Sequence, residues 1–497
     1  MEPLLSYARV FAGASRYDEA GNAYPFHAPE GIRLVLTPAE KSEVVVIPDR
    51  PWERQQISHV TVRQDAGKYR MWYGARSGAP PTSQFMCYAE SEDGFRWNKP
   101  ELGLYEFEGS TKNNICLVGP HALRGSVFID ENPAGGDRYK KLGHSPRWYD
   151  EAGNEISNKE GLAKWKELGE QGYNRDEVRK KVRLVGTHRA MTSVDGIRWT
   201  VLDEPVFKAF CDSQTVAYFD VKKNRYVGYF RTKIDGRRAV GMSETENFSK
   251  WPVPKPILAA DALDGPSDCL YTNAYCRYPG TDLHLMFPAV FHQVDCSVEM
   301  QLAVSSNGVN WSRPSREPII PRGENGSGDE GGVYGGPGLV VLPDGRFALP
   351  YSGRTARHHE VYYRDVNTAG RFRLAMWPEH RLGGIRADNR GAFTLESRKI
   401  NGGELVLNYT ADRGGWIRAA LYENIPHPPE PADPLPGYSF DECERVSGDQ
   451  FRQSLKWKGS PDLSPLAGKK VNVRFEMNRA TLYAFELGTA TNERHST

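Results

Sequence analysis

One short turn sequence recurs along the chain and limits what the chain can fold into. It reads SEDGFRW at 91–97, SVDGIRW at 193–199 and, more loosely, SSNGVNW at 305–311, with a worn copy, SETENFSKW, at 243–251. An Asp-Gly or Asn-Gly pair suits a tight turn between two strands, because both residues tolerate positive φ. We expect the Trp three residues after the Gly to fold back on the base of that hairpin. The repetition predicts a series of β-meanders.

The segments around each turn have the pattern of a four-stranded unit. From Trp52 the chain reads as strand, turn and strand (ISHVTVRQDAGKYRMWYGA), then as a third strand with the repeated turn (FMCYAESEDGFRW). Four strands in roughly 50 residues is the size of a propeller blade. Similar units begin near Asn114, near Asp212, at Leu270 and after the Gly-rich segment RGENGSGDEGGVYGGPG. The sequence therefore predicts an all-β chain with a five-bladed β-propeller over 52–386.

Three other segments do not have the pattern of the repeated four-stranded unit. Residues 1–51, with expected strands at 32–37 and 42–47, are predicted to cover or close the main body. Residues 152–181 are rich in Ala, Leu, Lys and Glu without strand alternation, which predicts a short helical insertion in blade two. Residues 387–497 contain consecutive antiparallel strands, a Pro-rich turn and two expected final strands (KKVNVRFEMNRATLYAFEL), which together predict a C-terminal β-sandwich.

Composition and charge narrow the classes of partner. The 64 basic and 63 acidic residues give a net charge of +1, which does not favour nucleic acid or an anionic membrane as partner. The apolar runs are too short to span a bilayer. No signal peptide is visible at the N-terminus, and the seven cysteines lack a CxxC pair. These features predict a cytoplasmic protein, or a secreted or periplasmic one if a signal has been trimmed. The oligomeric state is left open.

Several segments carry a resemblance to a known group of proteins. They are SEDGFRWNKPELGLYEFEGSTKNNI, DSQTVAYFD, VYGGPGL and DLSPLAGKKVNVRFEMNRATLYAFEL. The chain resembles, over nearly its whole length, bacterial proteins related to family 32 and family 43 glycoside hydrolases. The resemblance implies a five-bladed propeller, a C-terminal sandwich and an oligo- or polysaccharide substrate.

The chain also departs from the family patterns. The Asn-Asp-Pro and Arg-Asp-Pro signatures of family 32 are missing, and its Glu-Cys pair occurs only as Glu442-Cys443, inside the predicted sandwich. The repeated turn is similar to a shortened sialidase Asp-box, but sialidases usually have six blades. We therefore transfer neither fructosidase nor sialidase activity to this chain.

Acidic residues at the starts of the inner strands are the candidates for catalysis. Glycoside hydrolysis needs one carboxyl group to protonate the leaving oxygen and another to act as base or nucleophile. The resemblance implies a third that orients the acid. We predict Asp212, Glu330 and Glu53 as catalytic, because they come just before SQTVAYF, VYGGPGLV and ISHVTV. The alternative for each is a loop carboxylate or a hairpin cap. Further acidic residues near such starts are Asp49, Asp264 and Asp268.

A second set of residues is predicted to bind the substrate. Cations near the funnel would bind acidic sugars or lower the pKa of a carboxyl group, aromatic rings would stack on sugar rings, and an amide would bind hydroxyl groups. Glu299, which opens a third strand, is a substitute catalytic acid. The alternative for every member is a structural role, such as packing between blades. The predicted binding residues are His59, Arg231, Tyr271, Asn273, His292, Glu299, Trp52 and Tyr334.

Other motifs do not predict a cofactor. Gly326-x-Gly328-x-x-Gly331 matches a dinucleotide fingerprint literally, but it precedes a strand and lacks the helix that would hold a pyrophosphate. A structural Ca²⁺ at GSGDEGG is possible, although a flexible Gly-rich turn is the favoured interpretation. The pair His358-His359 beside Glu360 is expected to lie in a solvated loop rather than to bind a metal.

The favoured interpretation is a carbohydrate-active enzyme, a glycoside hydrolase that uses carboxylates in the propeller funnel. The alternative is a polysaccharide lyase with a His or Tyr base and a neutralised uronate, in which His59, His292 and Arg231 would outrank the carboxylates. A third possibility is a non-catalytic glycan-binding propeller.

Overall fold

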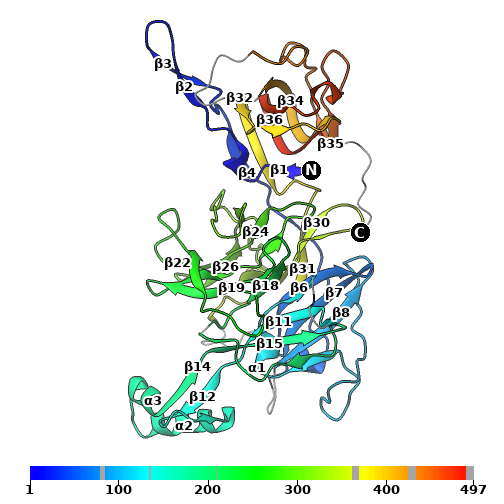
Figure 1. Cartoon of the computed structure of the whole chain (residues 1–497). Coiled ribbons are helices and arrows are strands. Elements are labelled where there is room, and N and C mark those ends of the chain that lie inside the picture. Colours follow the sequence, from blue (N-terminus) through cyan, green and yellow to red (C-terminus); the bar gives the residue numbers. More distant parts are fainter. Residues whose placement is uncertain are drawn as a thin grey trace. The chain divides into compact units, whose positions relative to one another are not determined.

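The computed structural model describes residues 1–78, 84–131, 133, 136–209, 211–360, 369–423 and 433–488. The chain divides into two compact units (Figure 1). Unit 1 comprises Met1–Pro38, Gly280–Asp282 and Trp377–Thr497, and unit 2 comprises Ala39–Pro279 and Leu283–Met376. The segment predicted over 1–51 is thus shared between the units, and the later division falls at Met376 rather than at 386. Both units are built from strands, so the prediction of an all-β fold is confirmed.

Unit 2 is a series of antiparallel meanders. The first sheet contains β6 (Gln56–Asp65), β7 (Lys68–Arg76), β8 (Gln84–Ser91) and β9 (Ile115–Val118). The second contains β10 (Val127–Ile129), β11 (Tyr139–His144), β15 (Thr187–Ser193), β16 (Thr200–Val201) and β17 (Phe207–Lys208). The third contains β18 (Val216–Asp220), β19 (Arg225–Ile234), β20 (Arg237–Thr245) and β21 (Lys255–Leu258).

The last two meanders share hydrogen bonds. A larger sheet joins β22 (Asp268–Thr272), β25 (Ala289–His292), β26 (Ser297–Met300), β28 (Gly332–Gly335), β29 (Val340–Val341), β30 (Phe347–Arg354), β31 (Arg371–Trp377) and β5 (Glu40–Lys41). A small sheet continues the fourth meander with β23 (Cys276–Arg277), β24 (His284–Met286) and β27 (Ala303–Ser305). Short helical turns occur at η2 (Pro51–Glu53) and α1 (Pro120–Leu123).

The insertion in the second meander is helical within the predicted stretch 152–181. It contains α2 (Asn158–Glu170) and α3 (Arg175–Lys181), together with β12 (Arg147–Asp150), β13 (Glu155–Ile156) and β14 (Val182–Val185), and it stands out from the sheets of unit 2 (Figure 1). The Ser157 side chain caps α2, and Asn174 caps α3 in a capping box with Glu177.

The three repeated turns that contain the Gly, at 91–97, 193–199 and 305–311, share one geometry. In each, the Ser hydroxyl accepts a hydrogen bond from the Gly N–H at 2.9 Å. The Asp or Asn Oδ1 accepts from the N–H groups of the two residues that follow the Gly, and the Trp Nε1 donates to the Gly carbonyl. Two turns also accept from a neighbouring sheet, at Gly196 from Trp72 (2.6 Å) and at Gly308 from Tyr229 (2.8 Å). The turn is therefore scaffold that links adjacent meanders.

The first strands of the meanders meet one another. Gln214, just before β18, donates to the Val60 carbonyl of β6 at 3.2 Å and to Ser126 Oγ, before β10, at 3.1 Å. Val62 of β6 donates its N–H to the Pro337 carbonyl at 3.3 Å, which places the first and last meanders side by side. N-terminal strand β5 completes the last sheet by pairing with β31. This is the pairing of a β-propeller; the count of five blades stays a prediction.

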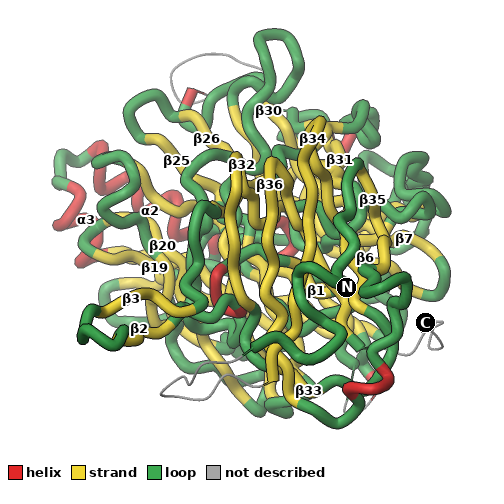
Figure 2. Tube along the Cα trace, turned by 90° about the horizontal axis from the view of Figure 1, so that it is seen from above, coloured by secondary structure: helices red, strands yellow, loops and turns green. Residues whose placement is uncertain are grey.

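Unit 1 is organised around one seven-stranded sheet. Its strands are β1 (Glu2–Pro3), β4 (Arg33–Leu36), β32 (Gly383–Thr394), β33 (Arg398–Lys399), β34 (Leu405–Glu423), β35 (Asp449–Ser454) and β36 (Lys470–Leu487). Figure 2 shows β32, β36 and β34 running side by side. A separate hairpin contains β2 (Ala14–Tyr17) and β3 (Ala23–Phe26), and the helical turns are η1 (Tyr7–Arg9) and η5 (Ser464–Leu466).

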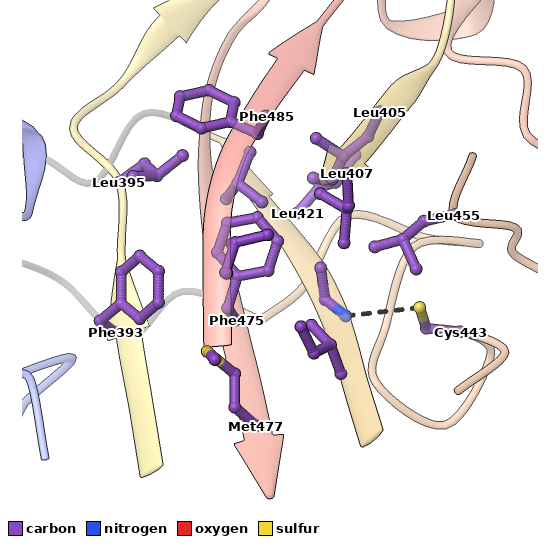
Figure 3. Packing of buried hydrophobic residues seen from close by; sticks show 14 of the residues in the cluster. Phe393, Leu395, Leu405, Leu407, Leu421, Cys443, Leu455, Phe475, Met477 and Phe485 are labelled. Carbon is purple, nitrogen blue, oxygen red and sulfur yellow. Dashed lines mark hydrogen bonds between the residues drawn. The ribbon is translucent and has the colours of Figure 1, made fainter. Parts of the chain in front are cut away.

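The C-terminal segment forms one long strand, not the two that were predicted. Strand β36 continues through Arg479, whose φ of 45° marks a bulge. The inward-facing residues change phase there, from the odd positions up to Met477 to Ala480 and Leu482. A bulge bends a strand, and side chains on both sides of the bend share one core (Figure 3). The bent sheet thus encloses its core as a sandwich does.

The Glu-Cys pair belongs to this core. Cys443 is buried, and its Sγ accepts a hydrogen bond from the Ala419 N–H at 3.4 Å (Figure 3). Glu442 pairs with Lys458 and accepts from the Ser439 N–H at 3.0 Å. Both residues therefore have structural roles within unit 1.

Candidate functional site

His59 lies among cations at a bulge in the first strand of unit 2. The pairing of β6 with β7 shifts register between Ser58 and Thr61, and His59 adopts a φ of 53°. Its Nδ1 shares a hydrogen bond with Ser58 Oγ at 2.8 Å. Burial lowers the pKa of His59 well below its usual value, and nearby cations lower it further. These cations are Arg124, Arg354, Arg76 and Lys141. His59 is therefore a neutral imidazole in a positively charged environment.

Asp212 forms an ion pair with Arg231. The Arg231 side chain, on β19, is 7% exposed and that of Asp212 is 30% exposed. The Arg231 guanidinium also lies over the Tyr271 ring, 5.7 Å from its centroid. Burial lowers the pKa of Arg231. The structure thus brings together three residues predicted from sequence and leaves the Asp212 carboxylate partly open to solvent.

Two further guanidinium groups lie against Tyr271 and other aromatic rings, which are those of Phe291 and Tyr334. Arg238 of β20 is 5.4 Å from the Tyr271 ring centroid and 5.0 Å from that of Phe291. Arg354, at the end of β30, is 4.8 Å from the Tyr334 ring centroid. Across the part of the chain that the structure describes, neither arginine has a carboxylate within ion-pair distance. The sequence analysis did not predict a binding role for Arg238 or Arg354.

Tyr334 and His358 share a hydrogen bond within this cluster. The Tyr334 hydroxyl lies 2.7 Å from His358 Nδ1, and the His358 ring lies 4.6 Å from that of Tyr271. Burial, and then Arg354, lower the pKa of His358 to about 3. Burial raises the pKa of the Tyr334 hydroxyl. At neutral pH the pair consists of an uncharged imidazole and an uncharged phenol. His358 therefore does not lie in the solvated loop expected for it.

His292 is bracketed by two carboxylates. Asp268 Oδ1 lies 2.8 Å from its Nδ1, and Glu299 Oε1 lies 3.4 Å from its Nε2. The three residues come from neighbouring strands β22, β25 and β26, and we call them the acid–imidazole triplet. The hydrogen bond with Glu299 is the main cause that raises the pKa of His292 to about 9. The triplet therefore holds a proton on His292 at neutral pH.

A titration tests the triplet. We expect His292 in the folded protein to titrate near pH 9, as measured by NMR of its ring protons. Because the folded pKa is raised, the stabilisation from its ion pairs is fully present below the ordinary histidine pKa of about 6.5 and is lost as the pH rises through about 9. His292→Gln should remove that part of the pH dependence of the melting temperature. A wild-type His292 that titrates near pH 6.5 would contradict the geometry of the triplet.

Glu53 and Trp52 lie in a different environment. Glu53 is fully buried in η2, where it accepts from the Tyr73 hydroxyl at 2.6 Å and from Lys99 Nζ at 2.8 Å. Burial raises the pKa of Glu53. The Trp52 Nε1 donates to Asn114 Oδ1 at 2.9 Å. Within the described ranges, no contact joins Glu53 or Trp52 to Asp212, Arg231 or Tyr271. The hydrogen bonds of Glu53 and Trp52 are those of a buried structural network.

The side chains of Glu330 and Asn273 accept hydrogen bonds from backbone N–H groups. Glu330 accepts from the N–H groups of Gly326 (3.3 Å) and Gly328 (2.8 Å), which is the capping role named as its alternative. Asn273 is buried and accepts from the Tyr275 N–H at 3.2 Å. A catalytic role for Glu330 and hydroxyl binding by Asn273 stay predictions that these contacts do not support.

The Gly-rich segment is braced by a cation of the chain itself. Asp329 pairs with Lys41 Nζ at 2.7 Å and accepts from the Tyr351 hydroxyl at 3.0 Å. Among the described residues, no group of three or more His, Cys, Asp or Glu side chains is placed to hold a metal ion. The same residues include no helix long and apolar enough to cross a membrane.

The sequence matches between this chain and known proteins are short. No family model matches the chain. The uncharacterized protein Rv1502 of Mycobacterium tuberculosis is 33% identical over 72 residues, which are 14% of this chain and 23% of that protein. The uncharacterized protein MT1551, from another strain of that species, is 34% identical over 64 residues, 12% of this chain and 21% of that protein. The chain thus spans under a quarter of these relatives.

Solved structures to which the chain is similar include glycoside hydrolases. A glycosyl hydrolase from Bacteroides ovatus gives a TM-score of 0.43 at 14% identity, over 69% of this chain and 94% of that protein. A thermostable family-43 glycoside hydrolase gives 0.41 at 11% identity, over 67% and 92%. An N-acetylgalactosamine deacetylase from F. plautii gives 0.41 at 14% identity, over 70% and 95%. The function proposed below rests on the geometry of the site.

Proposed function

We propose that the protein is a carbohydrate-active enzyme that hydrolyses a glycosidic bond where the first strands of unit 2 meet. One observation carries the proposal: Asp212 and Glu299 are partly exposed carboxylates, each beside a cation that fixes its position. Tyr271 lies against Arg231 and belongs to β22, the strand that also contributes Asp268 to the triplet. Carboxylates beside an aromatic ring are the groups that cleavage and sugar stacking need.

The two carboxylates would have different roles. Protonation of the leaving oxygen requires a group that holds a proton at neutral pH, and the acid–imidazole triplet holds one on His292. Glu299, in contact with His292 Nε2, would relay that proton to the substrate. Asp212, oriented by Arg231, would act as base toward water or as nucleophile at the sugar carbon.

A second reaction is supported by the Tyr334–His358 hydrogen bond. Elimination at a uronate needs a neutral base that removes the proton next to the carboxylate, and a cation that neutralises the carboxylate. Neutral His358 with Tyr334 would supply the base, and Arg354 the cation. The leaving oxygen would take the proton of the Tyr334 hydroxyl as its C–O bond breaks and the new C=C bond forms. This is the lyase alternative of the sequence analysis, with His358 and Arg354 in place of the predicted His59, His292 and Arg231.

Products from a panel of neutral and acidic oligosaccharides distinguish these reactions. Hydrolysis predicts new reducing ends without absorbance from a C=C bond, whereas elimination predicts new reducing ends together with that absorbance. Binding of an oligosaccharide without either product would leave a glycan-binding propeller. The proposal of hydrolysis is wrong if every cleaved substrate yields the unsaturated product.

A further inference from the structure

Three guanidinium groups converge on one set of aromatic rings in unit 2. Arg231 and Arg238 both lie over Tyr271, at 5.7 and 5.4 Å from its centroid, and Arg354 lies over Tyr334 at 4.8 Å. The two tyrosine rings are 6.4 Å apart, and the His358 ring contacts both. The arginines come from β19, β20 and β30, so three strands that are distant in sequence contribute one cationic cluster.

The three arginines of this cluster have one carboxylate partner among the described residues. Asp212 pairs with Arg231. The Arg238 guanidinium donates to the Cys269 sulfur at 3.6 Å and lies over two aromatic rings. The Arg354 guanidinium lies over the Tyr334 ring, and its Nε is buried without a hydrogen bond. A ring face attracts a cation by about 0.5–2 kcal/mol but does not accept the paired N–H donors of a guanidinium as a carboxylate does.

Several well-covered arginines elsewhere in the chain pair with carboxylates. Arg313 is matched to Asp264 at 2.7 Å, Arg381 to Asp449 at 2.7 Å and Arg418 to Glu476 at 2.8 Å. Arg238 and Arg354 are partly buried, and cations gathered without such partners repel one another where water is partly excluded. Within the described part of the chain, Arg238 and Arg354 lack a carboxylate partner while sharing one set of aromatic rings with Arg231, which leaves room for a ligand that supplies the negative charge.

We propose that Arg238 and Arg354, with neutral His59 and His358 beside them, form a receptor for an oxyanion on the substrate. The substrate would be a sugar that carries a carboxylate, sulfate or phosphate group, because a guanidinium binds each of these through two parallel N–H donors. The Tyr271 and Tyr334 rings would contact the sugar. This inference rests on the proposed function only in taking the cluster as the substrate site.

Simple anions test the receptor without knowledge of the sugar. Acetate, sulfate and inorganic phosphate would be titrated into the intact protein at constant ionic strength, set with chloride, and followed by calorimetry and melting temperature. We expect at least one anion to bind saturably and to raise the melting temperature with the logarithm of its concentration. The preferred anion identifies the group: acetate for a uronate, sulfate for a sulfated sugar, phosphate for a phosphorylated one.

Variants locate the binding. Arg238→Gln/Arg354→Gln should weaken the preferred anion by about 10-fold or more, since hydrogen bonds to charged groups are lost. Arg237→Gln is the matched control, because the exposed Arg237 is the next residue on β20 and donates to the Pro266 carbonyl. Arg238→Lys/Arg354→Lys keeps the charge and should retain part of the affinity, which guards against a folding defect in the glutamine variant.

The outcomes separate this inference from the proposed function. Anion binding that is lost in Arg238→Gln/Arg354→Gln, with no cleavage of any glycoside, keeps the receptor and removes the enzyme. Cleavage of neutral glycosides without saturable binding of any of the three anions overturns the receptor and keeps the enzyme. Equal anion affinity in the wild type and the glutamine variant also overturns the receptor.

Discussion

Asp212→Asn is expected to lower glycosidic-bond cleavage by about 100-fold to 10,000-fold, the usual contribution of a positioned acid or base. The amide keeps the size of the side chain but cannot accept a proton or form a glycosyl intermediate. Binding of an oligosaccharide should persist, because the rings of Tyr271 and Tyr334 are untouched. The measurement is kcat and KM on a substrate found in the panel, with binding followed separately by calorimetry.

Two controls make the Asp212→Asn result specific. Asp344→Asn changes a surface carboxylate of unit 2 that pairs with Arg346 at 2.7 Å, and it should leave kcat unchanged. A melting curve of Asp212→Asn shows whether loss of the partner of Arg231 unfolds the protein. Unchanged cleavage by a folded Asp212→Asn protein would remove Asp212 from the mechanism and favour the Tyr334–His358 reaction.

The scaffold could be predicted from sequence because its hydrogen bonds are local. Within seven residues, Ser193 and Asp195 satisfy the backbone of their own turn, so the motif SVDGIRW contains its own structure. Knowing where each turn lies also gives the start of the next inner strand. That reasoning placed Asp212, Tyr271 and Tyr334 in one region, because each comes just before or within the first strand of a meander.

The cations of the site could not be predicted in this way. Arg238 and Arg354 come from second and third strands, and their direction depends on register and twist. His358 lies in a segment whose composition indicates a solvated loop, yet contacts with Tyr271 and Phe291 bury it. Glu330 satisfies the predicted position but bonds to its own loop. Acidic residues at strand starts serve equally as caps, and sequence position does not separate the two roles.

Glu53 is the clearest case of a carboxylate whose structural role could not be told from its position in the sequence. Its position before the first inner strand resembles that of a catalytic acid, but its partner Lys99 comes from the loop after the SEDGFRW turn. That loop returns Lys99 Nζ to within 2.8 Å of Glu53 and 2.6 Å of Asp49. Such a pairing depends on the packing of the whole first meander, and no local pattern indicates it.

Lys99→Met should destabilise the protein by about 3–5 kcal/mol, because it leaves the carboxylate of Glu53 buried without its cation. Glu53 is 0% exposed, and burial already raises its pKa. Loss of Lys99 raises that pKa further, so the carboxylate form is the costly one. The destabilisation should be largest at neutral pH and should shrink as the pH falls and Glu53 becomes protonated. Urea unfolding at several pH values measures it.

Two further variants decide between a structural and a catalytic Glu53. Glu53→Gln/Lys99→Met removes both charges and should recover most of the lost stability while keeping cleavage activity. Arg54→Met breaks the surface pair with Glu108, whose side chains are 61% and 53% exposed, and should cost less than about 1 kcal/mol. If Glu53→Gln instead abolished cleavage in a protein of unchanged stability, Glu53 would be catalytic. The buried ion pair with Lys99 leads us to expect the opposite, because a carboxylate closed off from solvent cannot reach a substrate.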